Sequence, residues 1–147
     1  MRAKVILCAV VVLTALLAVT AAGAATPAAY RGQVNAICRG YSPALKQLEA
    51  QYTAAEKKKD TAAQGLALGR MFGTILVENG RIEKIAVPAE LTGTMTPILK
   101  LLRTMDGHIR AAQTRGPSEL VAAANLGPSL EKLYDGAGLR DCGSNQG

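Results

Sequence analysis

The side chains that could bind a haem or a soft metal are those of Met71, Met95, Met105 and the single histidine, His108. Met105 and His108 stand three positions apart, so on a helix they would share one side. Met95 and Met105, however, also fall on an apolar helical stripe, where methionine commonly fills a core. The sequence has no C-x-x-C-H motif for haem attachment. We therefore predict no cofactor and no metal site, and keep a haem or metal binder as an alternative.

Catalytic groups do not occur at spacings that would assemble a site. A carboxylate di-iron centre needs Glu-x-x-His on two helices, but the one histidine, His108, has Met105 three positions before it. Asp106 and His108 are two positions apart and face different sides of a helix. The serines near the starts of predicted helices are typical caps or first-turn residues: Ser42, Ser118 and Ser129. We predict no catalytic residue, and that the protein is not an enzyme.

Two of the three cysteines are candidates for a disulfide. Cys8 lies inside an apolar N-terminal segment that is typical of a signal peptide, which leaves Cys38 and Cys142 in the mature chain. An even pair in an exported chain predicts a disulfide because that compartment is oxidising. The bridge would close a loop of about 104 residues, for which chain entropy gives a stabilisation of up to ~4.7 kcal/mol.

Asn79 is a polar residue on an otherwise apolar helical stripe. A buried asparagine commonly fixes the register between helices at some cost in stability, and we favour that role. If the helices enclose a dry cavity, Asn79 and His108 are the candidate polar residues facing a ligand such as an apolar small molecule or a lipid.

Three glycines four positions apart, Gly65, Gly69 and Gly73, form the most distinctive local pattern. Such a row leaves a smooth helix face that another helix can approach closely. We predict that this candidate helix-contact face packs within the chain. Self-association and membrane contact are the alternatives, although Arg70 interrupts the apolar run and the run is shorter than a membrane span.

The N-terminus has the three parts of a secretory signal peptide. Arg2 and Lys4 precede an apolar run over residues 5–19, and small residues follow over 21–25. We predict a signal peptide over residues 1–24 and a single domain over 25–147. Cleavage after position 25 and retention as a membrane anchor are the alternatives.

The mature chain would carry a mild positive charge. Without Arg2 and Lys4, 15 basic residues face 11 acidic ones, for a net charge of +4. This dispersed charge, one phenylalanine and no tryptophan argue against a nucleic-acid partner. The partner stays unknown. The basic run over residues 57–59 allows weak contact with an anionic envelope polymer or membrane surface, although a solvated helix end is the simpler interpretation.

Apolar residues recur every three or four positions, which predicts an all-α fold with four helical segments. These cover about 28–59, 61–86, the stretch from Pro88 to Gly116, and the stretch from Pro117 to about 137. Ser42-Pro43 predicts a kink in the first segment, and Gly127-Pro128 a kink or split in the fourth. The predicted inward residues include Val34, Cys38, Leu48, Leu68, Phe72, Ile75, Ile82, Leu91, Met95, Ile98, Leu102, Met105, Ile109, Leu130 and Ala137.

The spacing and the short connections favour an up-down-up-down four-helix bundle. In that topology the start of the first helix and the end of the fourth lie together, which places Cys38 near Cys142.

The segments Asn35-Ala36-Ile37-Cys38 and Gly138-Leu139-Arg140-Asp141-Cys142-Gly143 give the chain a resemblance to a group of proteins. It resembles uncharacterised small Ala-rich exported helical proteins of high-GC Gram-positive bacteria, which have one cysteine near each end of the mature chain. The resemblance implies a disulfide-clamped bundle that is secreted or resides in the cell envelope. It implies no activity.

These observations favour a non-enzymatic, extracytoplasmic helical bundle that binds or scaffolds another molecule. The first alternative is a membrane-active or self-associating protein that uses the Gly65/Gly69/Gly73 face. The second is a haem or metal binder.

Overall fold

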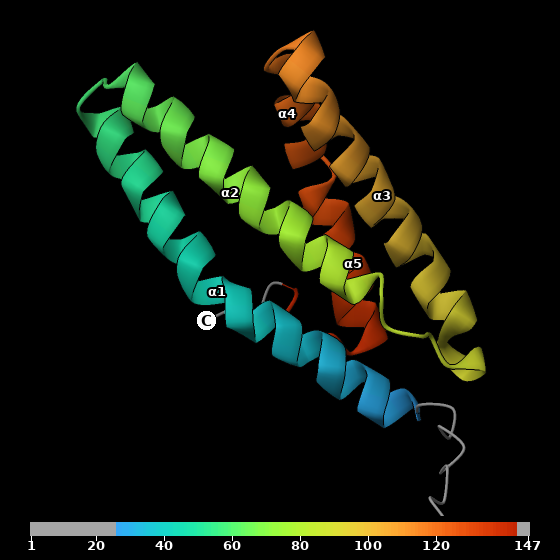
Figure 1. The fold of residues 1–147 in the computed structure, drawn as a ribbon. Coiled ribbons are helices and arrows are strands. Elements are labelled where there is room, and N and C mark those ends of the chain that lie inside the picture. The colour runs from blue at the N-terminus through green and yellow to red at the C-terminus, as the bar shows by residue number, and fades with distance from the viewer. Residues whose placement is uncertain (1–25, 144–147) are drawn as a thin grey trace, which may run out of the picture.

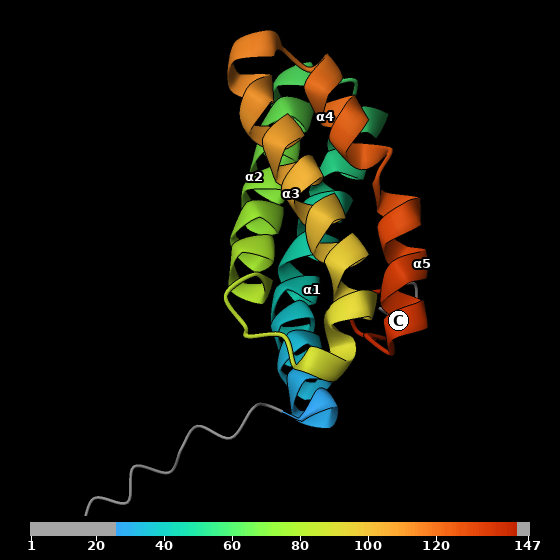
Figure 2. The ribbon, with the colours of Figure 1, turned by 90° about the vertical axis from the view of Figure 1, so that its right-hand side faces the viewer.

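The computed structural model describes residues 26–143, which are helical and contain no strand. The predicted signal peptide, with Cys8 and both cleavage positions, lies outside the described residues. Figures 1 and 2 show a bundle of helices with short connections. The elements in order are α1 (Pro27–Lys57), α2 (Thr61–Ile82), the 3-10 turn η1 (Ala89–Leu91), α3 (Thr92–Arg115), α4 (Ser118–Ala124) and α5 (Gly127–Ala137). The predicted all-α bundle is therefore confirmed.

The first two helices form a hairpin whose ends are set by local capping. The Thr26 hydroxyl oxygen accepts a hydrogen bond from the Ala29 amide, and proline occupies the first turn of α1. The chain then turns at Lys59, which has a positive φ of 55°. The Asp60 carboxylate accepts from the Ala63 amide and begins α2. A tight three-residue turn thus places α1 beside α2.

Proline and glycine modify the helices close to the predicted positions. Pro43 lies inside α1, which Figure 1 shows changing direction about halfway along its length. Proline cannot donate the helical hydrogen bond and crowds the preceding turn, which bends a helix. The predicted fourth segment is split into α4 and α5, and α5 begins at Gly127 with Pro128 in its first turn.

The second helix is shorter than its apolar pattern predicts. It ends at Ile82 rather than near Ala86, so the prediction for residues 83–86 is wrong. Pro88 disfavours the helical conformation at Val87. Ile85 and Val87 pack against the core from the connecting segment instead. An extended connection can therefore bury these side chains without continuing the helix.

The core is centred on α3, which contacts α2, α4 and α5. Leu91 of η1 continues the apolar stripe of α3. Five of the predicted inward positions of α3 are buried, in steps of three and four: Met95, Ile98, Leu102, Met105 and Ile109. Gly116, with a φ of 94°, ends the helix as predicted. The apolar stripe of α3 is therefore covered from Met95 to Ile109.

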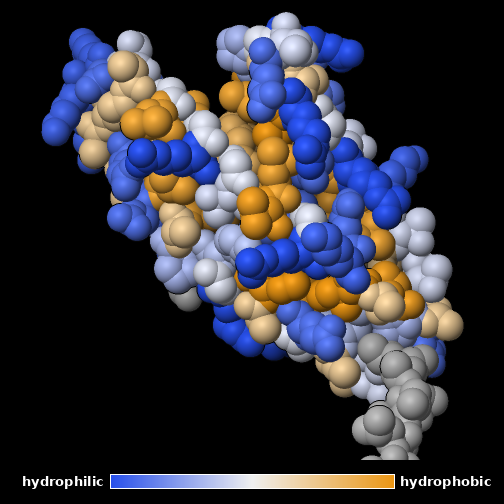
Figure 3. All heavy atoms as spheres, in the orientation of Figure 1, coloured by the Kyte–Doolittle hydropathy of each residue, from blue (hydrophilic) through white to orange (hydrophobic). Residues whose placement is uncertain are grey.

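The α1–α2 hairpin joins the core at one end, whereas the buried residues of its outer end are the small Ala55 and Ala67. Tyr30, Val34 and Cys38 belong to the core, whereas Leu48 and Phe72 farther along the hairpin are half-buried. Figure 1 shows the outer end of the hairpin diverging from α3 and α4. Figure 3 shows a notch between the outer end of the hairpin and the α3–α4 end of the molecule, and it shows hydrophobic surface on the face in view. The predicted inward stripes of α1 and α2 are thus only partly covered.

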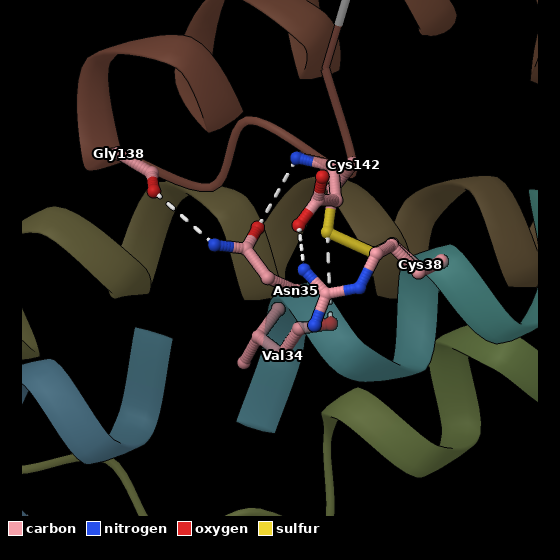
Figure 4. A network of polar contacts seen from close by, with 7 residues as sticks. Val34, Asn35, Cys38, Gly138 and Cys142 are labelled. Carbon is pink, nitrogen blue, oxygen red and sulfur yellow. Dashed lines mark hydrogen bonds and ion pairs between the residues drawn. A yellow bond between two sulfur atoms is a disulfide. The ribbon is translucent and has the colours of Figure 1, made fainter. Parts of the chain in front are cut away.

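The predicted disulfide joins Cys38 of α1 to Cys142, whose Cα atoms lie 5.1 Å apart. Asn35 reinforces this connection, because its side chain accepts from the Asp141 amide at 3.2 Å and donates to the Gly138 carbonyl at 3.5 Å (Figure 4). An ion pair between Arg39 and Asp141 lies beside the bridge. The disulfide is confirmed, and polar contacts hold the end of the described chain against α1.

Among residues 26–143, no helix combines the length and apolarity that crossing a membrane requires.

Candidate binding site

A cavity of about 160 Å³ opens between α2, α3 and α5. Its walls combine aliphatic side chains with a small group of polar ones. The residues that line it are Ile75, Glu78, Asn79, Met105, Gly127, Leu130, Glu131, Tyr134 and Cys142. Because Cys142 is tied to α1, the disulfide fixes one edge of the cavity. We call this cavity the α2–α5 pocket.

Glu78 is the most unusual residue of the pocket. Its side chain is only 9% exposed, and no hydrogen bond or ion pair from residues 26–143 reaches its carboxylate. Burial raises the pKa of Glu78 to about 7, because a low-dielectric environment disfavours the charged form. A buried carboxyl without a partner is costly to folding. Such a group is a candidate for function rather than for stability.

Asn79 lies beside Glu78 and has a defined partner. Its amide Nδ2 donates to Asp106 Oδ1 of α3 at 2.7 Å. Burial raises the pKa of Asp106, and the hydrogen bond from Asn79 and the charge of Arg110 partly oppose that rise. Asn79 thus connects α2 to α3, which agrees with the predicted register role, and it also lines the pocket. Its two predicted roles are compatible.

Two buried tyrosines complete the polar group. Tyr134 of α5 lines the pocket and is 5% exposed. Burial, followed by the nearby Glu78, raises the pKa of its hydroxyl. Tyr30 of α1 is fully buried, and its hydroxyl has no hydrogen-bond partner in the described part of the chain. Both tyrosines stay neutral at physiological pH, so the pocket's ionisable character comes from its carboxyl groups.

His108 does not line this pocket, so its predicted role as a ligand-facing residue is not supported here. Its Nδ1 lies 2.6 Å from Glu119 Oε2 and joins α3 to α4. That contact is the main cause of a lowered pKa at Glu119, to which Arg115 also contributes. The side chain therefore has a structural partner between two helices.

The glycine row lies on an exposed face of α2. Gly65, Gly69 and Gly73 are all exposed, and a Cβ added at any of them would meet no atom within 4 Å. The prediction that this face packs tightly within the chain is therefore wrong. Ala67, on another side of α2, is buried, and Gly73 borders an open groove that α1 also lines. The glycines leave an open surface flanked by the exposed side chains of Leu66 and Val77.

Two of the methionines are core residues. Met95 and Met105 are buried in the core, as their stripe positions predict. Within residues 26–143, no three His, Cys, Asp or Glu side chains are grouped so that they could hold a metal ion.

The sequence interpretation missed Glu78, Glu131 and Tyr134. Glu78 directly precedes Asn79, so two adjacent polar residues interrupt the apolar side of α2, and this doublet was the available signal. Tyr134 follows Leu130 by one helical turn and could be assigned to the same face. What could not be seen is that the two helices bring these groups to one cavity.

No protein-family model, curated protein or solved structure matches this chain. A function must therefore be proposed from the chain's own residues.

Proposed function

We propose that this protein is a non-enzymatic, extracytoplasmic bundle of up-down-up-down topology that binds a small molecule in the α2–α5 pocket. The observation that carries the proposal is the combination of aliphatic walls with a buried, unpaired carboxyl group at Glu78. Small-molecule sites are typically apolar cavities with a few polar groups that orient the ligand.

The composition of the pocket supports binding rather than catalysis. Among residues 26–143, those that line it include no serine, threonine or histidine, and the cysteine among them is held in the disulfide. A nucleophile with an adjacent base is the usual requirement for covalent catalysis. The disulfide and the N-terminal sequence pattern support an exported location, secreted or in the cell envelope. The likeness to small exported proteins of high-GC Gram-positive bacteria agrees with this proposal.

Filling the pocket tests the proposal. Gly127 lines the cavity, and an added Cβ there would meet no atom within 4 Å, so Gly127→Leu can occupy the space without a backbone clash. Gly136 lies on the same helix, is exposed and does not line the pocket, so Gly136→Leu is a matched control. We expect saturating toluene to raise the Tm of the wild type and of Gly136→Leu, but not that of Gly127→Leu. No response in the wild type, or an equal response in Gly127→Leu, would contradict binding in this pocket.

A second function, self-association or membrane contact through α2, is favoured by the exposure of Gly65, Gly69 and Gly73. Gly69→Glu would place a charge on this face. Gly93→Glu on α3 is the control, because Gly93 is also exposed with open space around it. If this function holds, the wild type and Gly93→Glu will float with phosphatidylglycerol liposomes or sediment as oligomers, and Gly69→Glu will not. Flotation at low salt alone would instead indicate contact through Lys57, Lys58 and Lys59. A monomer that never floats would exclude both.

The haem or metal alternative is tested by the absorbance spectrum and metal content of the purified protein. A Soret band or stoichiometric metal would support it, and the absence of both would eliminate it.

A further inference from the structure

We propose that the α2–α5 pocket binds an organic cation, a primary ammonium group on a compact apolar body, with Glu78 as its counter-ion. This inference depends on the proposed function, because it names the class of ligand for the same pocket. It rests on the charges, the free hydrogen-bond acceptors and the size of the cavity.

The pocket is negatively charged within a basic protein. In the part of the chain that the structure describes, Glu78 and Glu131 line it and no lysine, arginine or histidine does, although the whole chain carries a net charge of +6. Glu78 is buried and Glu131 is exposed, so one carboxylate lies inside the cavity and the other at its edge. A low-dielectric cavity with charges of one sign attracts ligands of the opposite sign. Anionic ligands would meet repulsion from both groups.

The hydrogen-bonding groups of the pocket are mainly acceptors. Glu78 offers two carboxylate oxygens, and neither has a partner among residues 26–143. Asn79 uses its Nδ2 on Asp106, which leaves its carbonyl oxygen as an acceptor. The Tyr134 hydroxyl both donates and accepts. A primary ammonium group has three donors and no acceptor, so it complements this set.

A cation would also remove the cost of burying Glu78. A carboxylate with little access to water and no opposite charge beside it is unfavourable, and a hydrogen-bonded opposite charge offsets much of its desolvation. The charged or titratable groups around the pocket are Glu131 and Tyr134 of α5, Asp106 and Arg110 of α3, and Tyr30 of α1. Arg110 acts on Asp106 and is not part of the pocket lining, so it does not neutralise Glu78.

The volume limits the size of the apolar body. A cavity of about 160 Å³ is close to the ~150 Å³ engineered cavity that accepts benzene. Ile75, Met105 and Leu130 provide aliphatic contacts for a group of that size. Benzylammonium has this size and charge and is a suitable probe. Benzyl alcohol is its neutral analogue, and benzoate is its anionic analogue.

The test is calorimetric titration of the disulfide-bonded chain with these three probes at pH 8 and pH 6. At pH 8 we expect benzylammonium to bind at least tenfold more tightly than benzyl alcohol, and benzoate to bind more weakly than both. The affinity for benzylammonium should fall about tenfold at pH 6, because Glu78 then carries a proton, whereas that for benzyl alcohol should change little.

Glu78→Gln should abolish both the preference for the cation and its pH dependence. Glu49→Gln is the control, because Glu49 is exposed on α1 and does not line the pocket. If Glu78→Gln does not fold, the comparison of the three probes on the wild type still decides. Equal affinity for benzylammonium and benzyl alcohol at pH 8 would overturn the cation inference and leave the pocket proposal intact. Failure of all three probes to bind would overturn both.

Discussion

At the scale of single residues, Glu78 determines what the pocket can do. The apolar surroundings of this carboxyl shift its protonation into the physiological range, since burial raises its pKa to about 7. Residues that only fill a core do not have this property. The neighbouring Asn79 already donates its Nδ2 to Asp106, whereas the Glu78 carboxylate has no partner among residues 26–143.

The pH dependence of stability follows from the raised pKa of Glu78. The unfolded chain releases this proton near pH 4.5, but the folded chain keeps it until about pH 7. The folded state therefore binds more protons between these values, and stability falls as the pH rises through them. The shift corresponds to a loss of up to about 3 kcal/mol by pH 8.

Denaturant unfolding at pH 5 and pH 8 measures this loss. Glu78→Gln has no titrating group at this position, so we expect its stability to change less between the two pH values than that of the wild type. Comparing the two proteins cancels the opposite contribution of Glu119, whose pKa is lowered. Parallel pH profiles would show that Glu78 is not desolvated.

At the scale of secondary-structure elements, the end of α5 depends on one glycine. Gly138 follows the helix with a φ of 75° in the left-handed region, where only glycine is free of strain. The Arg31 guanidinium donates to the Ala137 carbonyl beside it at 2.8 Å. This cap directs the chain towards Cys142 and the pocket edge.

Two alanine substitutions on α5 should have opposite effects. Gly138→Ala forces a left-handed alanine and should lower the free energy of unfolding by about 1–2 kcal/mol. Gly136→Ala, inside the helix and exposed, should raise it by roughly 0.5–1 kcal/mol. Thermal unfolding of both variants measures the difference. Equal effects would mean that the cap geometry is not as described.

The elements differ in how well their sequences predict them. The stripe of α3 was predicted well because its apolar residues from Met95 to Ile109 are all buried in the core. Proline and glycine marked the bend of α1 and the break between α4 and α5. The predicted end of α2 lay beyond the observed end at Ile82. Ile85 continues the apolar pattern of the helix although it lies in the connecting segment. The glycine face was predicted to pack within the chain but is exposed, since spacing identifies a face and not what lies against it.

At the scale of the whole molecule, the arrangement is asymmetric. The disulfide end of α1 belongs to the core, while the outer end of the α1–α2 hairpin diverges from α3 (Figure 1). Helical periodicity specifies which side of each helix is apolar, but it does not specify the angle between helix pairs. The pocket lies where α2 meets α3 and α5, so its existence could not be predicted from any one helix.

The disulfide should supply a large part of the stability of this small core. It joins residues 104 positions apart, and loss of such a bridge typically costs 2–5 kcal/mol. We expect Cys38→Ser to lower the Tm by roughly 10–20 °C with little change in helical content at room temperature. Circular dichroism melting checks both quantities. Arg39→Ala removes only the exposed ion pair and should cost less than about 1 kcal/mol. Equal melting points for Cys38→Ser and the wild type would contradict a structural role for the bridge.

Direct titration of the Glu78 carboxyl by carbon-13 NMR, assigned with Glu78→Gln, tests the central claim of a buried, unpaired acid in a ligand pocket. We predict a midpoint near pH 7 in the free protein and a midpoint at least one pH unit lower in saturating benzylammonium, because the cation favours the ionised form. A midpoint near the ordinary value of 4.5 that benzylammonium does not move would contradict the claim.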